Sequence, residues 1–353
     1  MPPLDSGSEL GAFSRYVLPY KAQRGPDTGM SDRRPPGTGL EDATVLVTGG
    51  AGFIGSHLTA ALLPETDVRV LDDFSTGEPS KIPDGAAVFR ADIRNEDALD
   101  RAMADVDVVF HLAAVVSVEQ SVSNPIESHR VNVDGTLAVL ERARREDARV
   151  VVASSAAVYG DPDELPVDET AATDPLSPYG ADKLAADTYA RVCADAYDLP
   201  VAVLRFFNVY GPGQRGPYSG VVDAFLQRAF ADDPLVIHGD GEQTRDFVHV
   251  ADVVRTLLAA ASTADTGRAF NVGTGESVSI NELADVVRDA TGTSAGVEHV
   301  DARPGDIRES RADCTRLRDR LGVAPDVSLR EGIGDLVAHR RSRDAGERPE
   351  RLQ

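Results

Sequence analysis

Residues 44–55 read TVLVTGGAGFIG, and this stretch decides the fold. Its first part, Thr44–Thr48, is β-branched and apolar, which predicts a buried strand, and apolar residues recur at helical spacing after it. Between strand and helix lie Gly49, Gly52 and Gly55, each three residues from the next. Glycine permits a tight turn and a close approach to a pyrophosphate, and the helix N-terminus supplies free N–H groups. The pattern predicts a dinucleotide-binding turn.

Acidic residues follow the next two predicted strands. Asp72 comes directly after the strand Val68–Leu71, twenty residues past Gly52. A carboxylate at this place can accept both hydroxyls of the NAD ribose, and it would repel the 2′-phosphate of NADP. Asp92 and Ile93 come at the end of the third strand, where they would flank the adenine. For either acid, the alternative interpretation is a solvated loop carboxylate.

Predicted strands and helices alternate from residue 44 to residue 206. The strands are apolar throughout, which is typical of a parallel sheet covered by helices on both faces. The sequence therefore predicts an α/β fold, a Rossmann-type doubly wound parallel sheet with a smaller C-terminal substrate domain. The predicted strands are 44–48, 68–71, 88–91, 106–112, 149–153 and 201–206. A first predicted helix has apolar residues at Phe53 and Ile54. Further predicted helices cover 98–103, 128–145 and 177–196.

A change in sequence character near Asn208 predicts a domain boundary. From there the chain has Gly/Pro loops, scattered arginines and a predicted helix over 221–231. Residues 268–273 are a candidate for a strand that returns to the sheet. Both ends of the chain are polar and lack sustained periodicity, which is typical of flexible segments. The predicted divisions are an arm or upstream sequence at 1–40, a NAD-binding domain at 41–207, a substrate domain at 208–339 and a tail at 340–353.

Composition and charge exclude several classes of protein. The chain has 353 residues, 42% of them hydrophobic, and a net charge of −22. Nucleic acid and anionic membranes repel such a polyanion, so we expect neither as a partner. No apolar run approaches the ~20 residues that a membrane span needs. Two cysteines, Cys193 and Cys314, are too few for a disulfide framework or a metal site, which predicts reduced thiols, no metal and a cytoplasmic location.

Lysine is scarce in this chain. It occurs only as Lys21, Lys81 and Lys183, and the other basic residues are arginine. An acid-rich, lysine-poor surface suits a halophilic cytoplasm, because salt screens the self-repulsion of the surface. This hypothesis predicts a refolding yield that rises with salt, and full stability in dilute buffer would contradict it.

A candidate catalytic group follows the fifth predicted strand. Tyr179 and Lys183 lie four residues apart, on one face of a predicted helix. A phenol with a pKa of ~10 is a poor base, and a nearby ammonium with the positive nicotinamide ring of NAD⁺ would lower that pKa. Ser155 ends its strand at the sheet edge where ligands bind, and its hydroxyl can bridge Tyr179 and a substrate oxygen. The alternatives are a surface Tyr/Lys pair and a capping serine. We do not expect His111 or His249 to act as a base.

With these motifs, the chain resembles an extended short-chain dehydrogenase/reductase. It is most similar to the UDP-glucose 4-epimerase family of NAD-dependent sugar-nucleotide enzymes, and the resemblance covers residues 43–335. The matching strings are TGGAGFIG (48–55), LDDFSTG (71–77), HLAA (111–114), VNVDGT (131–136), SSAAVYG (154–160), SPYGADK (177–183), RFFNVYGP (205–212), GDGEQTRDFVHV (239–250) and RPGDIRES (303–310).

The resemblance implies a role for each matched residue. Tyr179 would be the base on the sugar 4-hydroxyl, Lys183 its electrostatic partner and Ser155 the bridging hydroxyl. Arg245 would bind the substrate diphosphate, because guanidinium forks hold phosphate oxygens; the alternative is an ion pair with Asp246 or Asp306. The implied cofactor-binding residues are Gly49, Gly52, Phe53, Ile54, Gly55, Asp72, Asp73, Asp92, Ile93, Leu112, Ala113, Ala114, Asn132, Tyr179 and Lys183. The implied substrate-binding residues are Ser155, Tyr179, Asn208, Arg245, Arg303, Asp306 and Ser310.

Two alanines argue against relatives with other chemistry. The 4,6-dehydratases of this family carry an Asp–Glu pair where this chain has Ala156 and Ala157, and uronate decarboxylases usually carry Glu at the second position. Ser310 falls where the family gates the sugar pocket, and a small residue there leaves room for an N-acetylated sugar. The chain departs from the family at Val116, where a lysine is common.

The resemblance implies epimerisation of a UDP-hexose at C4 through a 4-keto sugar, with NAD retained throughout. The alternatives are another sugar-nucleotide epimerase or reductase, such as a UDP-glucuronate 4-epimerase that would use Arg215 at the carboxylate, and a non-catalytic NAD-binding scaffold. The family forms homodimers through helices of the nucleotide-binding domain, so we expect a homodimer through 98–103 and 128–145.

Overall fold

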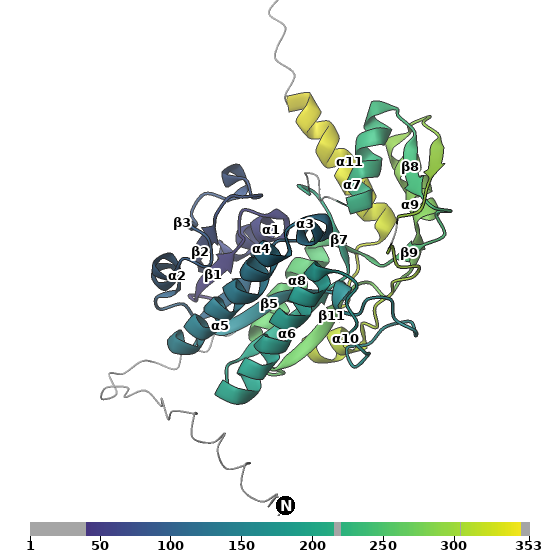
Figure 1. Ribbon diagram of the computed structural model, residues 1–353. Coiled ribbons are helices and arrows are strands. Elements are labelled where there is room, and N and C mark those ends of the chain that lie inside the picture. The colour runs from purple at the N-terminus through teal and green to yellow at the C-terminus, as the bar shows by residue number, and fades with distance from the viewer. Residues whose placement is uncertain (1–39, 215–219, 304, 347–353) are drawn as a thin grey trace, which may run out of the picture. The chain divides into compact units, whose positions relative to one another are not determined.

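The computed structural model describes residues 40–214, 220–303 and 305–346 (Figure 1). All of them belong to one compact unit that spans Pro35–Gln353. The expected arm at 1–40 lies outside the described residues except for Leu40, which is 2% exposed and packs in the main core. Within the described part of the chain, no helix is long and apolar enough to cross a membrane.

Seven parallel strands form the central sheet. Their order is β11-β6-β5-β4-β1-β2-β3. Strands β2 and β3 follow on one side of β1 and the later strands on the other side, so the order in which strands are added reverses between β1 and β4. Such a reversal defines the crevice in which open α/β sheets bind ligands. The order confirms the doubly wound parallel sheet predicted from the sequence. The strands are β1 (Thr44–Thr48), β2 (Asp67–Asp72), β3 (Ala87–Arg90), β4 (Val108–His111), β5 (Arg149–Ser155), β6 (Val201–Phe206) and β11 (Arg268–Val272).

Helices cover both faces of this sheet. On one face, α2 (Glu96–Met103), α5 (Gly135–Glu146) and α6 (Pro178–Tyr197) bury apolar side chains such as Met103 and Leu140, and Figure 1 shows α5 and α6 side by side. On the other face, α1 (Phe53–Leu62) packs beside α8 (Val250–Ser262) and contributes Leu58 to the main core. Most strands are covered on both faces, which explains their continuous apolar runs, whereas the edge strand β3 has exposed residues such as Val88.

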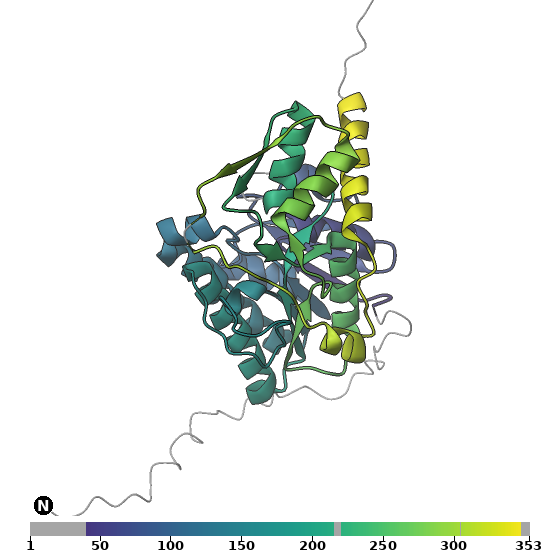
Figure 2. The same cartoon turned by 90° about the vertical axis from the view of Figure 1, so that its right-hand side faces the viewer.

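The remaining elements build a smaller part with its own core. Figure 2 shows its helices α7, α9 and α11 close to one another, and Phe225, Leu283 and Ile333 bring them together. The elements are α7 (Gly220–Ala231), β8 (Leu235–His238), β9 (Thr244–Arg245), β12 (Val278–Ser279), α9 (Ile280–Thr291), β13 (Val297–Val300) and α11 (Leu329–Gly346). The expected tail at 340–353 therefore begins inside a helix, which Arg340 anchors by an ion pair with Asp223.

The border between the two parts is not a single point in the sequence. Helix α8 packs with the main sheet, although it falls inside the predicted second domain at 208–339, and strand β11 lies within 268–273, the candidate for a strand that returns to the sheet. Strand β11 pairs in parallel with β6, and α10 (Thr315–Leu321) lies against it. The short strands β7 (Asn208–Tyr210) and β10 (Phe247–His249) pair where the chain leaves the sheet.

The segment before α5 differs from the single helix predicted over 128–145. It folds as α3 (Val118–Ser123), α4 (Pro125–His129) and a π-helical turn over Arg130–Asp134, after which α5 begins. Pro125 begins α4, as is common for proline in a first turn. A π-turn inserts an extra residue per hydrogen-bonded ring, and such turns are frequent at functional sites.

A buried ion pair fixes α6 to the sheet. Arg205 on β6 and Asp187 on α6 are 3% and 0% exposed, and Arg205 Nε donates to Asp187 Oδ2 over 2.8 Å. Arg205 Nη1 also donates to the Tyr159 hydroxyl over 2.9 Å, and that hydroxyl donates to Asn271 Oδ1 over 2.7 Å. The network links β6, β11, α6 and the segment after β5 beneath the carboxyl edge of the sheet.

We expect Asp187→Asn to lower the free energy of unfolding by about 3–5 kcal/mol, because it leaves the Arg205 charge buried without its partner. Guanidinium unfolding followed by circular dichroism measures the change. Asp195→Asn, on an exposed turn of the same helix, is the matched control and should unfold like the wild type. A loss below 1 kcal/mol in Asp187→Asn would show that the pair does not hold the helix.

Candidate functional site

A cavity of about 620 Å³ lies at the carboxyl edge of the sheet. The glycine turn after β1 lines it, together with residues that follow β2, β3, β4 and β5. Asn208, Val221 and Phe247 line it from the smaller part. This is the location that the strand reversal between β1 and β4 predicts for a ligand.

Close backbone contacts explain the glycines of the turn. Gly49 has a φ of +73°, and a Cβ there would lie 2.8 Å from the Ala113 nitrogen. A Cβ on Gly55 would lie 2.2 Å from the carbonyl oxygen of Gly49, so α1 can approach the turn only with glycine at this position. Gly52 is the N-cap of α1 and offers no side chain to the free N–H groups of the first turn. Those N–H groups remain available to a phosphate.

Asp72 ends β2 at the cavity wall, where the sequence predicted a ribose-binding carboxylate. Its Oδ2 accepts from Ala51 N over 2.9 Å and its Oδ1 from Phe74 N over 2.8 Å. Burial raises the pKa of Asp72, and these two backbone hydrogen bonds counteract part of the rise. Each carboxylate oxygen keeps a second lone pair for a ligand hydroxyl. Asp73 also lines the cavity and accepts from Ser75.

Asp92 and Ile93 line the cavity after β3, but an arginine occupies the carboxylate of Asp92. Arg94 Nη2 donates to Asp92 Oδ2 over 2.6 Å and reaches Glu127 of α4 over 2.8 Å. The Arg94 guanidinium lowers the pKa of Asp92. Arg94 and Glu127 were not predicted as site residues, because nothing in the sequence spacing indicates that α4 lies across the cavity from β3.

The catalytic candidates Ser155, Tyr179 and Lys183 come together at the end of β5. All three line the cavity, where burial raises the pKa of the Tyr179 phenol and the Ser155 hydroxyl counteracts part of the rise. Lys183 Nζ donates to the carbonyl oxygen of Ala153 over 2.9 Å. Burial lowers the pKa of Lys183 to about 8, against the opposing charge of Asp182.

The pKa of the Tyr179 phenol in the protein alone differs from the expected one. Burial raises the pKa of Tyr179 in the protein alone, although the sequence analysis expected Lys183 to lower it. The cause is the removal of the phenol itself from water, and Lys183, which donates to the Ala153 carbonyl, does not offset it. A lower pKa of Tyr179 therefore depends on the positive charge that a bound cofactor brings.

Local sequence explains why Tyr179 is fixed in place. Ser177 is the N-cap of α6 and accepts from Gly180 N over 3.1 Å, while Pro178 occupies the first helical position. The Tyr179 N–H would then lack a partner, and Ser121 Oγ of α3 accepts it over 3.0 Å. These contacts satisfy the first turn of the helix that bears the phenol.

His111 lies buried under the site in its neutral form. The Thr136 hydroxyl donates its proton to the Asn132 carbonyl, so the Thr136 oxygen can only accept from His111 Nε2, over 2.9 Å. The other ring nitrogen, Nδ1, then accepts from the Thr48 hydroxyl over 2.8 Å. Burial lowers the pKa of His111 to about 3. A histidine that stays neutral and bonded at both nitrogens does not act as a base. Leu112, Ala113 and Ala114, which follow it, line the cavity.

Asn132 does not line the cavity directly. It lies in the π-turn, and its amide pairs with the backbone of Val115: Nδ2 donates to the carbonyl over 3.0 Å and Oδ1 accepts from the N–H over 2.8 Å. Val115 and Val116 are cavity residues. Asn132 therefore shapes the wall of the cavity through the segment that follows β4.

Of the implied substrate-binding residues in the smaller part, Asn208 alone lines the cavity. Arg245 forms an ion pair with Asp306, which is the alternative considered for it from the sequence. Arg303 is exposed and Ser310 is buried with 7% exposure, and neither is among the described residues that line the cavity. Asn208 Nδ2 donates to the Asp246 carbonyl over 3.3 Å, so backbone next to Arg245 orients Asn208.

Several cavity residues were assigned no role in the site from the sequence. They come from the loop after β2, from α3 and from the ends of β6 and β7, and tertiary packing alone brings them together. Lys81 is one of them, and its Nζ donates to the Gly213 carbonyl over 3.3 Å. The cavity residues that received no site role from the sequence include Ser75, Thr76, Gly77, Lys81, Gln120, Phe206, Phe207, Val209, Tyr210, Gln214, Val221, Val222 and Phe247.

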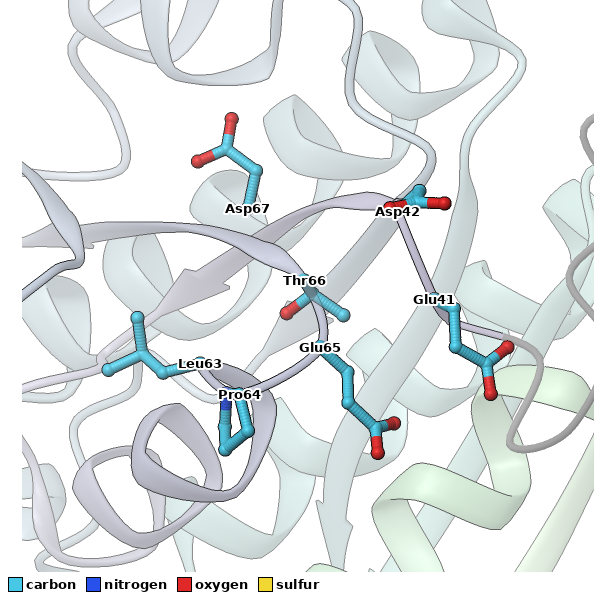
Figure 3. A pocket seen from close by; sticks show the side chains of 7 residues that line it. All are labelled: Glu41, Asp42, Leu63, Pro64, Glu65, Thr66 and Asp67. Carbon is cyan, nitrogen blue, oxygen red and sulfur yellow. The ribbon is translucent and has the colours of Figure 1, made fainter.

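A second hollow, of about 570 Å³, lies at the opposite edge of the sheet. It is lined by residues around the starts of β1 and β2, and Figure 3 shows the carboxylates of Glu41 and Glu65 pointing to the same side. Parallel sheets bind ligands at their carboxyl ends, which this hollow does not adjoin. Among the described residues, no group of His, Cys, Asp and Glu is arranged to hold a metal ion.

The strand reversal, the glycine turn and the Ser155–Tyr179–Lys183 group define a dinucleotide-binding enzyme of the α/β class. The sequence matches the family model described as the NAD dependent epimerase/dehydratase family over residues 45–273. The chain belongs to this family, and NAD is its cofactor.

Similar proteins include sugar-nucleotide epimerases. A UDP-glucose 4-epimerase of Mycolicibacterium smegmatis is 41% identical over 304 residues, which cover 83% of this chain and 96% of the relative. A solved UDP-N-acetylglucosamine 4-epimerase from Methanobrevibacter ruminantium is 33% identical with a TM-score of 0.83, and the match covers 86% of this chain and 100% of that one. The UDP-glucose 4-epimerase of Thermotoga maritima, solved with UDP-glucose, is 36% identical with a TM-score of 0.82, and covers 85% and 99%.

The cavity fits NAD by its own geometry. The free N–H groups after Gly52 suit the pyrophosphate, and the contact between Gly49 and Ala113 leaves no room for a side chain in that turn. Asp72 presents a carboxylate where a ribose hydroxyl would bind. Tyr179 and Lys183 would lie at the nicotinamide end, because they line the cavity beyond the ends of β4 and β5.

We expect Gly55→Ala to lose most of its bound NAD, because the added Cβ would force the turn and α1 apart. The measurement is the amount of NAD released by acid from the purified protein after gel filtration. Gly334→Ala, at a helical position where a Cβ meets nothing within 4 Å, is the matched control and should retain NAD as the wild type does. Equal NAD content in the two variants would contradict the role assigned to the turn.

Proposed function

We propose that this protein interconverts the C4 epimers of a UDP-hexose, by transient oxidation to a 4-keto sugar. The observation that carries the proposal is the meeting of Ser155, Tyr179 and Lys183 at the carboxyl edge of the sheet, in the cavity that holds the dinucleotide turn. The epimerases among its relatives and solved neighbours support the same activity. A scaffold that only binds NAD has no use for a phenol, an ammonium and an alcohol at this place.

The catalytic roles follow from the chemistry of each group. NAD⁺, when bound, supplies a reversible acceptor for the hydride from C4. Tyr179 accepts the proton of the 4-hydroxyl during oxidation and returns it during reduction. Ser155 bridges the phenol and the sugar oxygen, and Lys183 provides the positive charge that stabilises the phenolate. Because the same proton and the same hydride return, no second acid or base is needed.

Epimerisation requires that the keto sugar present its other face before reduction. Asn208 contacts the nucleotide-sugar in the proposal, while Arg245 and Arg303, with Asp306 beside Arg245, hold the diphosphate. Anchoring the end that does not react supplies binding energy without fixing the hexose ring. In the structure Arg245 is paired with Asp306, so diphosphate binding requires Arg245 to exchange this partner for phosphate oxygens.

The residues after Ser155 favour an epimerase over enzymes with further acid–base steps. Ala156 and Ala157 form a short 3-10 turn with Val158, and Ala157 N donates to Ser155 Oγ over 3.2 Å. A methyl group cannot move the protons that dehydration or decarboxylation requires. A UDP-glucuronate 4-epimerase remains the second candidate, and Arg215, the residue named for it, lies outside the described residues.

The size of the accepted sugar is a finer proposal. Ser310 is small and buried, and we propose that it leaves space for an N-acetyl group, with UDP-GlcNAc as a second substrate. A solved neighbour described as a UDP-N-acetylglucosamine 4-epimerase supports this proposal. An absence of turnover with UDP-GlcNAc would refute it.

A homodimer and a cytoplasmic location complete the proposal. The apolar positions of 98–103 are buried within the chain, so they do not serve a dimer as the sequence analysis expected. Exposed apolar residues instead lie on α3, α4 and α6, with Val122 and Ile126 at 62% and 67% exposure and Tyr189 and Val192 on the neighbouring helix. Light scattering should give the mass of two chains, and the mass of one chain would contradict the dimer.

The activity is tested with a panel of UDP-sugars and no added cofactor. We expect UDP-glucose to convert to UDP-galactose, because NAD retained by the protein suffices for a reaction with no net redox change. UDP-GlcNAc and UDP-glucuronate are incubated in parallel, and the C4 epimers are separated by chromatography. A requirement for NADH in stoichiometric amounts would indicate a reductase and contradict the epimerase.

We expect Tyr179→Phe to lower kcat by about 10²–10⁴-fold, because it removes the group that carries the proton. Binding of UDP, measured by calorimetry, should change little, since the phenol does not contact the nucleotide in the proposal. Tyr197→Phe, at an exposed position at the end of the same helix, is the control. Turnover near the wild-type rate in Tyr179→Phe would remove the phenol from the mechanism.

A further inference from the structure

An ion pair joins two walls of the cavity, and the proposed mechanism uses neither of its residues. Arg94 follows β3 and Glu127 belongs to α4, and both line the cavity. Arg94 Nη2 lies 2.8 Å from Glu127 Oε1, and the two side chains are 32% and 38% exposed. The pair therefore spans the cavity at its β3 end, where the cavity meets solvent.

Arg94 reaches α4 from a fixed position. Its Nε donates to Asp92 Oδ1 over 2.9 Å and its Nη2 to Asp92 Oδ2 over 2.6 Å. Asp92 Oδ1 also accepts from the Arg94 backbone N–H over 2.8 Å. Two parallel bonds to one carboxylate fix the plane of a guanidinium. Glu127 thus meets a guanidinium that is already oriented.

The same two walls are in apolar contact in the interior. Ile93 is buried, and a Cβ on Gly135 would lie 2.4 Å from Ile93 Cδ1, so the first turn of α5 packs closely against it. Val131 of the π-turn packs against the core that contains Ile93, and both residues line the cavity. The apolar contact joins the walls on the inner side, and the ion pair joins them on the side of the solvent.

The part of NAD that would lie here is its adenosine end. Asp72, the expected ribose ligand, is in register with Arg90 on the neighbouring strand β3, four residues before Arg94. Ile93 and Val131 offer apolar surface to a flat base, and a guanidinium plane also suits an aromatic ring. The chemistry of this end of the cavity therefore fits adenine, with the ion pair at its outer side.

We propose that Glu127 is a positioning residue that acts through Arg94 to retain NAD. The ion pair closes the adenosine end of the cavity, and NAD leaves only after the pair opens. The inference concerns the cofactor that the whole family uses, so it does not depend on which sugar reacts. Its benefit to catalysis rests on the proposed function, because an epimerase must keep its reduced cofactor until the keto sugar is reduced.

The exchange of bound NAD tests the proposal without an assay of activity. Holoenzyme is mixed with an excess of NAD labelled with ¹⁴C, and the label on the protein is measured after gel filtration at timed intervals. We expect Glu127→Gln to exchange about fivefold faster, which is near the upper limit for an ion pair that solvent reaches. Glu119→Gln makes the same change of charge in the first turn of α3, at an exposed position, and should exchange like the wild type. Equal exchange rates in Glu127→Gln and the wild type would overturn the proposal.

A double-mutant cycle tests whether the effect passes through Arg94. Arg94→Gln should also speed exchange, and adding Glu127→Gln to it should change the rate little, because the contact is already lost. Should Glu127→Gln speed exchange equally in both backgrounds, Glu127 would act by another route, and the proposal would be wrong. A lower melting temperature with unchanged exchange would mean that the pair only holds α4 in place, which also contradicts the proposal.

The effect on turnover separates cofactor retention from chemistry. With UDP-glucose and excess NAD, we expect Glu127→Gln to keep the kcat of the wild type, because the pair lies at the end of the cavity away from Tyr179. Without added NAD, its activity should fall faster after gel filtration. A lower kcat at saturating NAD would contradict a role confined to retention. Faster exchange in a protein whose wild type does not turn over UDP-glucose would support the retention of NAD and contradict only the proposed function.

Discussion

The reversal of strand order between β1 and β4 is the constraint on which the rest of the structure depends. Strands β2 and β3 extend the sheet in one direction and β4, β5, β6 and β11 in the other, so the segments that leave β1 and β4 diverge. They bound a crevice at the sheet edge. The turn after β1 enters it so closely that Gly49 lies against the backbone of Ala113. Every other group of the site is placed by the strand or helix that reaches this crevice.

Removal from water then determines the charge states in the crevice. Burial raises the pKa of the Tyr179 phenol and lowers that of the Lys183 ammonium, so both groups move toward their neutral forms. The protein counteracts this with a hydrogen bond from Ser155 and with the carboxylate of Asp182. A phenolate forms in such surroundings only when another positive charge is near. The state of the base is therefore coupled to the occupancy of the dinucleotide site by its oxidised form.

The sequence predicted the elements whose signals are local. The apolar strands, the glycine turn and Asp72 follow from patterns within about thirty residues, and the parallel sheet is confirmed. Contacts between distant segments gave no such signal, as the pairing of Arg94 with Glu127 shows. The helix predicted over 128–145 is helical throughout but contains a π-turn, which was not predicted because such a turn has no composition of its own. The first residues of the tail expected from residue 340 belong to a helix that ends at Gly346, and the ion pair of Arg340 with Asp223 on another helix is a contact that periodicity cannot reveal.

The chain crosses between its two parts several times. It leaves the sheet after β6, with one residue before β7, returns through β10 into α8 and β11, and leaves again toward β12. Several connecting segments would have to bend together for the two parts to move apart, so these connections oppose a hinge motion. A fragment cut after Phe207 would lack α8 and β11, exposing an unpaired edge of β6 and the apolar face that α8 covers. Such a fragment is a candidate for aggregation rather than for an autonomous nucleotide-binding module.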